Sequence, residues 1–207
     1  MTVPAVRPPE PPLPDTGTGT PPGNVDGQAI AITVFSTVKW WGRVWLPAVF
    51  VAPKLLPNTL KTLKTLSFIH FARWNLIRTI PHKGASEPEV KLRYPHLYFE
   101  SNFNGGWEEY IDAFSHILTR GMTLFWGSSY GFPTPLPTGR FKAYIKRHEI
   151  VASHFYSAYP DATTTITLSA LELDAKLRDF RARTRGLEPE AFARAWREFL
   201  TDVQGSL

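Results

Sequence analysis

The sequence contains no cysteine, and this absence excludes several kinds of chemistry. None of its 207 residues can form a disulfide, hold a metal or an iron–sulfur cluster through a thiolate, or act as a thiol nucleophile. The six histidines also lack the spacing of a metal site, because no two of them stand four residues apart and no H-E-x-x-H motif is present. A reducing compartment fits this composition, and we predict a cytoplasmic protein without a bound metal.

Long uncharged apolar runs are missing as well. A membrane-spanning helix needs about 20 nearly uncharged residues, whereas Arg43 and Lys54 enclose only ten, two of which are prolines. A secretory signal would need a basic start and an apolar run, and residues 1–27 have neither. The overall balance, 43% hydrophobic and 20% charged residues, is typical of a soluble globular domain.

Proline is unevenly distributed and divides the chain. Eight of the 19 prolines fall within the first 22 residues, in a segment that also carries several glycines and few apolar side chains. Such a segment cannot bury enough apolar surface to offset the entropy of ordering. We predict a disordered arm over residues 1–27, a folded domain over residues 28–183 and a C-terminal helix within residues 184–207.

Hydrophobic periodicity within the folded part predicts alternating strands and helices. β-branched and aromatic runs predict four strands, near residues 29–35, 67–77, 94–103 and 151–159. Three- and four-residue spacings predict helices near residues 40–66 (interrupted by prolines), 107–118, 141–148, from 163 onward and from 189 onward. This order is a split βαβ pattern with additions, so we predict an α+β fold: a ferredoxin-like antiparallel sheet with helices on one face.

Three segments carry a resemblance to a known group of proteins: FIHFARW at residues 68–74, YFESNFNGGWEEY at 98–110 and FYSAYP at 155–160. Together they resemble a set of uncharacterised bacterial proteins that are similar to the dimeric α/β-barrel superfamily, over roughly residues 28–182. That superfamily includes haem proteins, small monooxygenases and non-catalytic binders. The resemblance implies the fold and a homodimer, and it leaves a haem-type oxidoreductase as an alternative function.

The second face of a one-sided sheet must be covered by a partner, a ligand or further elements. We therefore predict that this face binds an apolar, anionic small molecule without a covalent bond. An arginine on a strand is a natural clamp for a carboxylate. The alternative is a ladder ion pair between Arg73 and Glu100 that needs no function. The polar candidates on the predicted strands are His70, Arg73, Glu100, Asn102, His154 and Tyr156.

Positive charge is concentrated in one segment. Residues 28–83 hold eight lysines and arginines and no aspartate or glutamate. Tryptophans beside these cations have the chemistry of an interfacial anchor, so a peripheral site on an anionic membrane is a second alternative, at Trp40, Trp41, Arg43 and Trp45. The other interpretation is that the tryptophans cover the sheet. No aromatic pattern of an RNA-binding module is present, so we expect no nucleic-acid partner.

One motif and one set of histidines point toward catalysis. GSSYG at residues 127–131 matches the G-x-S-x-G nucleophile elbow, but Pro133, Pro135 and Pro137 exclude the helix that should follow Ser129. We therefore predict a loop. A haem would need only one axial ligand, and the histidines in aromatic surroundings are His70, His148 and His154. The residues themselves indicate no cofactor, and haem enters only through the resemblance.

Overall fold

The fold is built on a four-stranded antiparallel sheet in a computed structural model that describes residues 22–55, 66–80 and 89–206. The strands are β1 (Val25–Asp26), β2 (Ala29–Thr37), β3 (Ile69–Ile80) and β4 (Val90–Phe103), in the spatial order β1-β2-β4-β3. The predicted α+β class is confirmed. The three long strands lie where the β-branched and aromatic runs predicted them, and β3 and β4 extend a few residues further.

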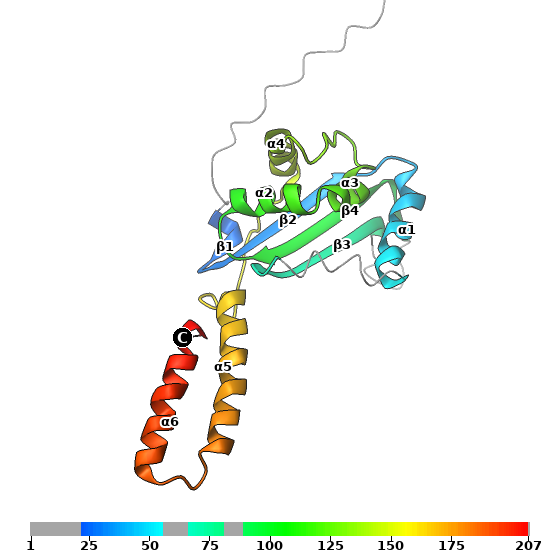
Figure 1. Ribbon diagram of the computed structural model, residues 1–207. Helices are drawn as coiled ribbons and strands as arrows, with labels where there is room; N and C mark the ends of the chain where they lie inside the picture. The colour runs from blue at the N-terminus through cyan, green and yellow to red at the C-terminus, as the bar shows by residue number, and fades with distance from the viewer. Residues whose placement is uncertain (1–21, 56–65, 81–88, 207) are drawn as a thin grey trace, which may run out of the picture.

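Six α-helices accompany the sheet in the described part of the chain. Figure 1 shows α2, α3 and α4 on one side of the sheet, α1 at one end of it, and α5 with α6 projecting from the opposite side. Two short 3-10 helices, η1 and η4, lie near the two ends of the described chain. The bounds of the α-helices are α1 Gly42–Leu55, α2 Trp107–Ile117, α3 Thr119–Trp126, α4 Thr138–His148, α5 Thr164–Arg183 and α6 Pro189–Asp202, and those of the 3-10 helices are η1 Pro22–Asn24 and η4 Gln204–Ser206.

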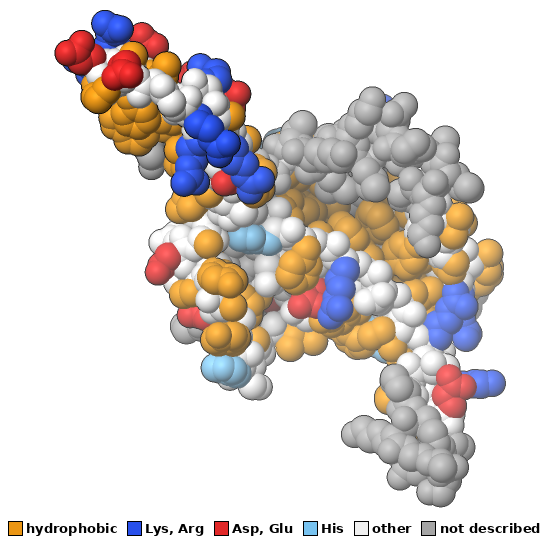
Figure 2. All heavy atoms as spheres, turned by 90° about the horizontal axis from the view of Figure 1, so that it is seen from below, with side chains coloured by type: hydrophobic (Ala, Val, Ile, Leu, Met, Phe, Trp, Pro, Cys, Tyr) orange, Lys and Arg blue, Asp and Glu red, His pale blue; other side chains and the backbone are white. Residues whose placement is uncertain are grey.

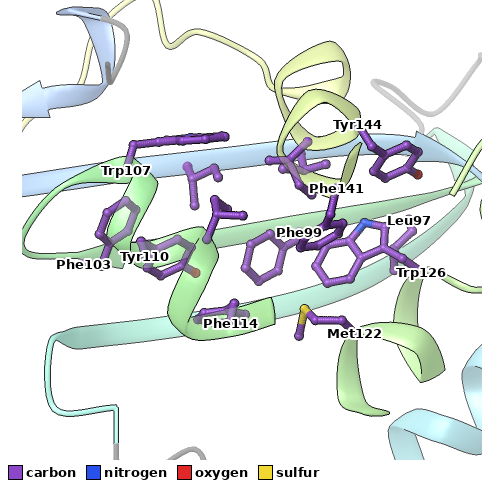
Figure 3. Packing of buried hydrophobic residues seen from close by; sticks show 14 of the residues in the cluster. Leu97, Phe99, Phe103, Trp107, Tyr110, Phe114, Met122, Trp126, Phe141 and Tyr144 are labelled. Atoms are coloured by element: carbon purple, nitrogen blue, oxygen red, sulfur yellow. The ribbon is translucent and has the colours of Figure 1, made fainter. Parts of the chain in front are cut away.

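The main core is an aromatic layer between the sheet and helices α2 to α4 (Figure 3). Successive side chains of a strand point to opposite faces, and Leu97, Phe99 and Phe103 of β4 all lie on the helix-covered face, where they are buried. Phe103 stacks on Tyr110 of α2, with ring centroids 3.8 Å apart, and Phe99 meets Trp126 of α3 edge-on at 5.0 Å. Packing in the core therefore determines which face of β4 is covered by helices α2 to α4 and which face they leave uncovered.

The predicted fourth strand near residues 151–159 is wrong. Residues 151–159 form no strand. Just before them, an isolated bridge joins Glu149 to Val34 of β2, and the Ile150 N–H donates to the Thr33 carbonyl at 2.8 Å. A strand here would need its backbone N–H groups for pairing, but a side chain from earlier in the sequence occupies one of them: the Asn24 side chain accepts from the Ala152 N–H at 2.7 Å. The outer edge of β2 pairs with β1 instead.

Residues 22–27, which the sequence places in the flexible arm, form part of this edge. Val25 and Asp26 pair with Ile30 and Ala29 in a tight hairpin, and Gly27 at its turn has a φ of 60°, which favours glycine. Asn24 is fully buried, and its side-chain amide donates to Glu149 at 3.4 Å. The rest of the predicted arm, residues 1–21, lies outside the described residues.

Helices α5 and α6 form a hairpin with a small core of their own. Phe180 of α5 packs on Phe199 of α6, with ring centroids 4.7 Å apart, and Val203 completes the buried set. This cluster shares no residue with the core of the sheet. The sequence predicts a domain boundary after residue 183, which is the end of α5. In the structure this position lies between the two helices of the hairpin, and α5 packs with α6. Across the described residues, none of the helices combines the length and the apolar character that crossing a bilayer requires.

Candidate functional site

The face of the sheet opposite α2, α3 and α4 carries a row of polar side chains along β4. The strand period places His96, Tyr98, Glu100 and Asn102 on this face, because they alternate with the buried residues of the core. We call these four residues the β4 polar row. Figure 2 views this side of the molecule, where acidic and basic side chains lie next to each other amid hydrophobic ones.

Glu100 is the centre of a compact hydrogen-bonded group. The register pairs it with Arg73 of β3, whose Nε donates to Glu100 Oε2 at 2.8 Å, with Nη2 2.6 Å from the same oxygen. The Tyr98 hydroxyl donates to that oxygen as well, at 2.8 Å. Burial raises the pKa of Tyr98, and the bond to the Glu100 carboxylate raises it further, so Tyr98 stays a neutral donor. The ladder ion pair foreseen as the alternative is therefore present.

Two other members of the β4 polar row have buried polar atoms without a partner. Neither His96 Nδ1 nor Asn102 Oδ1 makes a hydrogen bond within the described part of the chain. A buried polar atom without a partner costs free energy, about 1–3 kcal/mol. The His96 ring stacks on Phe35 of β2, with centroids 4.6 Å apart and planes 12° from parallel, so an apolar ring fixes its position. The row thus offers hydrogen-bonding capacity that the described residues do not use.

Apolar side chains flank the β4 polar row on both neighbouring strands. Phe35 of β2 lies opposite Tyr98, and Ile77 of β3 lies opposite His96. Phe71 of β3 lies opposite Asn102 and is 44% exposed. A few polar groups between apolar walls are the usual composition of a small-molecule site.

Three of the predicted site residues do not join this group. His70 falls at the irregularity of β3 between Ile69 and Phe71, and its side chain is exposed. His154 and Tyr156 lie on the irregular segment that replaces the predicted fourth strand, and Tyr156 is 74% exposed. Only Arg73, Glu100 and Asn102 of the predicted set share the open face. His96 and Tyr98 were missed, although the two-residue period through Glu100 and Asn102 pointed to them.

The predicted membrane-surface residues lie at the start of α1. Trp40 is 80% exposed, and Trp41 and Arg43 are exposed beside it. Trp45 rests on α3, where its indole N–H donates to the Leu124 carbonyl at 3.1 Å, and it keeps 42% of its surface exposed. The interpretation that these tryptophans cover the sheet is not what the structure shows for Trp40, since most of its side chain faces outward.

The histidines considered for haem do not fit that group. His148 hydrogen-bonds through Nδ1 to the Tyr144 carbonyl of its own helix at 2.8 Å, and its ring lies against the Tyr144 ring at a tilt of 38°. This bond leaves Nε2 as the atom that would face an iron. His70 and His154 are exposed and lie outside the hydrophobic core. An axial ligand needs a shielded pocket around the iron, and none of the three is fully buried, because His148 is half-buried and the other two are exposed.

The serine motif finds no support either. Ser129 is fully buried, its hydroxyl lies 3.1 Å from that of Ser36, and the next helix begins only at Thr138. The predicted loop is confirmed. Throughout residues 22–55, 66–80 and 89–206, no three histidine, aspartate or glutamate side chains gather in a group that could hold a metal ion.

Comparison with known proteins gave no match, neither to a family model, nor to a curated protein, nor to a solved structure. The resemblance to the dimeric α/β-barrel superfamily therefore stays a prediction, and the function has to be argued from the geometry.

Proposed function

We propose that this protein binds an apolar, anionic small molecule on the open face of its sheet, over the β4 polar row. The observation that carries the proposal is the pair of buried, unpartnered atoms, His96 Nδ1 and Asn102 Oδ1, on either side of the Arg73–Glu100 pair. Both atoms are closed to water, while their side chains are only half-buried, so a bound molecule would reach them through a small movement of these side chains and would then remove the cost of the missing partners. Phe35, which stacks on His96, and Phe71 offer apolar contact on the two sides of the row.

Arg73 is the residue that selects a negative charge. Its side chain is 59% exposed, so part of the guanidinium remains open to an incoming group while Nε and Nη2 contact Glu100. Guanidinium groups bind planar anions such as carboxylates through two parallel hydrogen bonds. Glu100 holds the guanidinium in position, and Tyr98 fixes the carboxylate in turn.

We also propose that the sheet is ferredoxin-like and that two copies of the chain form a dimer. β4 lies between β2 and β3 and runs antiparallel to both, with α1 in the connection between β2 and β3, as in the first part of a ferredoxin-like sheet. Two open faces packed against each other would shield the bound molecule from water, as in a two-sheet core. We accordingly propose a homodimer, and sedimentation equilibrium giving the mass of a single chain at micromolar concentration would refute this part.

The test uses anilinonaphthalene sulfonate, an apolar probe with one negative charge. We expect its fluorescence to rise on binding to the full chain, and Arg73→Met to weaken the affinity about tenfold, because a charge-assisted hydrogen bond contributes about 1.5–3 kcal/mol. Arg178→Met is the matched control. Arg178 is also an exposed arginine paired with a carboxylate, Asp174 at 2.8 Å, but it lies on α5.

Equal loss of affinity in both arginine variants would refute the site, and so would an unchanged affinity in Arg73→Met. A second measurement addresses the unpartnered atoms directly. His96→Phe keeps an aromatic ring against Phe35 and removes both ring nitrogens, so it should weaken probe binding while the melting temperature stays within a few degrees of that of the parent protein.

A further inference from the structure

Helix α1 is apolar on its outer side as well as on its inner side. Gly42, Leu46 and Val49 are buried toward the rest of the protein. On the other side a surface helix normally carries charged residues, yet Val44 is 78% and Val51 48% exposed. A contiguous patch of exposed apolar side chains is typical of a contact surface for protein or lipid.

The exposed side of α1 continues into the residues just before it. Trp40, just before the helix, is largely exposed, and Trp41 and Trp45 are each exposed over about two fifths of their surface. We call the exposed set Trp40, Trp41, Val44, Trp45 and Val51 the α1 apolar patch. Tryptophan at the edge of an apolar surface suits the boundary between lipid headgroups and acyl chains, because its ring is apolar and its N–H is polar.

Cations border this patch, and acids are absent from it. Arg43 is exposed in the first turn of α1, which contains no acidic residue. Arg78 of β3 reaches the same place, since its Nη2 donates to the Arg43 carbonyl at 2.7 Å. Lys39 stands just before the helix, and the whole segment 28–83 lacks aspartate and glutamate. The positive end of the helix dipole adds to this charge.

We infer that the α1 apolar patch docks onto the surface of an anionic lipid bilayer. Trp40 and Val44 would enter the boundary region, while Arg43, Arg78 and Lys39 contact lipid phosphates. Charge complementarity selects this occupant: a neutral partner would leave the three cations without counter-charges, whereas an anionic bilayer offers an apolar layer and negative charge side by side. Figure 1 places α1 at the end of the sheet remote from α5 and α6, so the hairpin does not obstruct this approach.

Vesicle sedimentation tests the inference on the full chain. We expect the protein to sediment with vesicles that contain phosphatidylglycerol and to stay in solution with pure phosphatidylcholine vesicles. The double variant Arg43→Gln with Arg78→Gln should bind about 30-fold more weakly, because each base near an anionic surface contributes roughly one factor of five. Arg181→Gln with Arg185→Gln removes the same charge from exposed positions on the hairpin and should bind like the parent protein.

The apolar contribution is tested separately. Trp40→Ser with Val44→Ser changes two side chains that are about four-fifths exposed, so the fold should be retained. We expect this variant to lose sedimentation with anionic vesicles, and the tryptophan emission of the parent protein to shift to the blue when such vesicles are added. A circular dichroism spectrum equal to that of the parent protein separates loss of binding from loss of fold.

Three outcomes would overturn the inference. One is failure to bind phosphatidylglycerol vesicles at low salt, and another is equal binding to neutral vesicles. The third is self-association that disappears in Trp40→Ser with Val44→Ser, since this would identify a second copy of the chain as the occupant. Because Arg73 and the β4 polar row are unchanged in these variants, probe binding on the open face should persist in all of them.

Discussion

The two faces of β4 use the same strand for different purposes. On the covered face, Leu97, Phe99 and Phe103 are almost inaccessible to water and pack against an aromatic layer from three helices. On the open face, Tyr98 and Glu100 alternate with them, and Glu100 pairs with Arg73 of the next strand while it accepts a hydrogen bond from Tyr98. One face therefore holds the fold together, and the other is free to carry polar groups that packing does not require.

The largest difference should appear when phenylalanine is removed from each face. Phe99→Ala leaves a cavity among Trp74, Phe114 and Trp126, whose rings lie 4.9–6.4 Å from that of Phe99, and should lower the free energy of unfolding by about 3–5 kcal/mol. Phe71→Ala makes the same change on the open face and should cost at most about 1 kcal/mol. Urea unfolding followed by circular dichroism measures both, and equal losses would remove the distinction between the faces.

A smaller effect should come from Glu149, a carboxylate on the covered side that the structure buries. Its side chain is 2% exposed, with Lys146 3.2 Å away. Burial raises the pKa of Glu149, and the charge of Lys146 offsets this in part. A raised pKa in the folded state means that the charged form is disfavoured there, so the protein should become more stable as pH falls from neutral toward the ordinary glutamate pKa.

Glu149→Gln should abolish this gain. Each unit of pKa difference between the folded and unfolded chains corresponds to about 1.4 kcal/mol. Thermal melts between pH 7 and pH 4.5 would show it, with Glu109→Gln, an exposed position on α2, as the control that keeps the pH dependence of the parent protein. A parallel pH profile in Glu149→Gln and the parent protein would contradict the assignment.

The smallest effect concerns the open-face ion pair itself. Arg73 and Glu100 are cross-strand neighbours with one partner largely exposed, and such pairs couple by about 0.2–1 kcal/mol. A double-mutant cycle with Arg73→Met and Glu100→Gln would measure the coupling in the absence of any ligand. A coupling above about 2 kcal/mol would mean that the pair stabilises the fold as the covered face does, and would leave less reason to assign it to binding.

Much of the sheet could be predicted because its strands have strong periods. The runs at residues 29–35 and 94–103 are dominated by β-branched or aromatic side chains, and the structure places strands over both. Helix α3 was not predicted, because its eight residues include Gly121 and two threonines, which have low helix propensity. The helix is stabilised by the burial of Met122 and Trp126 in the core. The strand predicted at residues 151–159 failed because its hydrogen bonds go to side chains of η1 and β1, which no local pattern reveals.

The candidate site, like the sheet, could be predicted in part. The sequence offered the pairing of Arg73 with Glu100 as the alternative to a binding pocket, and the strand register of the structure sets the two residues opposite each other. His96 and Tyr98 could have been found by extending the two-residue period of β4. The placement of His154 and Tyr156 could not, because it follows from a segment whose path is set by contacts with residues more than 100 positions away, such as the bond from the Ser157 N–H to Asp26.

The separate core of the α5–α6 hairpin has a consequence for how the protein opens. Its described link to the sheet unit includes the Thr164 N–H, which donates to the Asn104 side chain at 3.0 Å, while Phe180, Phe199 and Val203 pack only within the hairpin cluster. The amide protons of α5 and α6 should therefore exchange with solvent through an opening that leaves β4 protected. On heating or in denaturant, the α5–α6 hairpin should unfold before the sheet and its helices do.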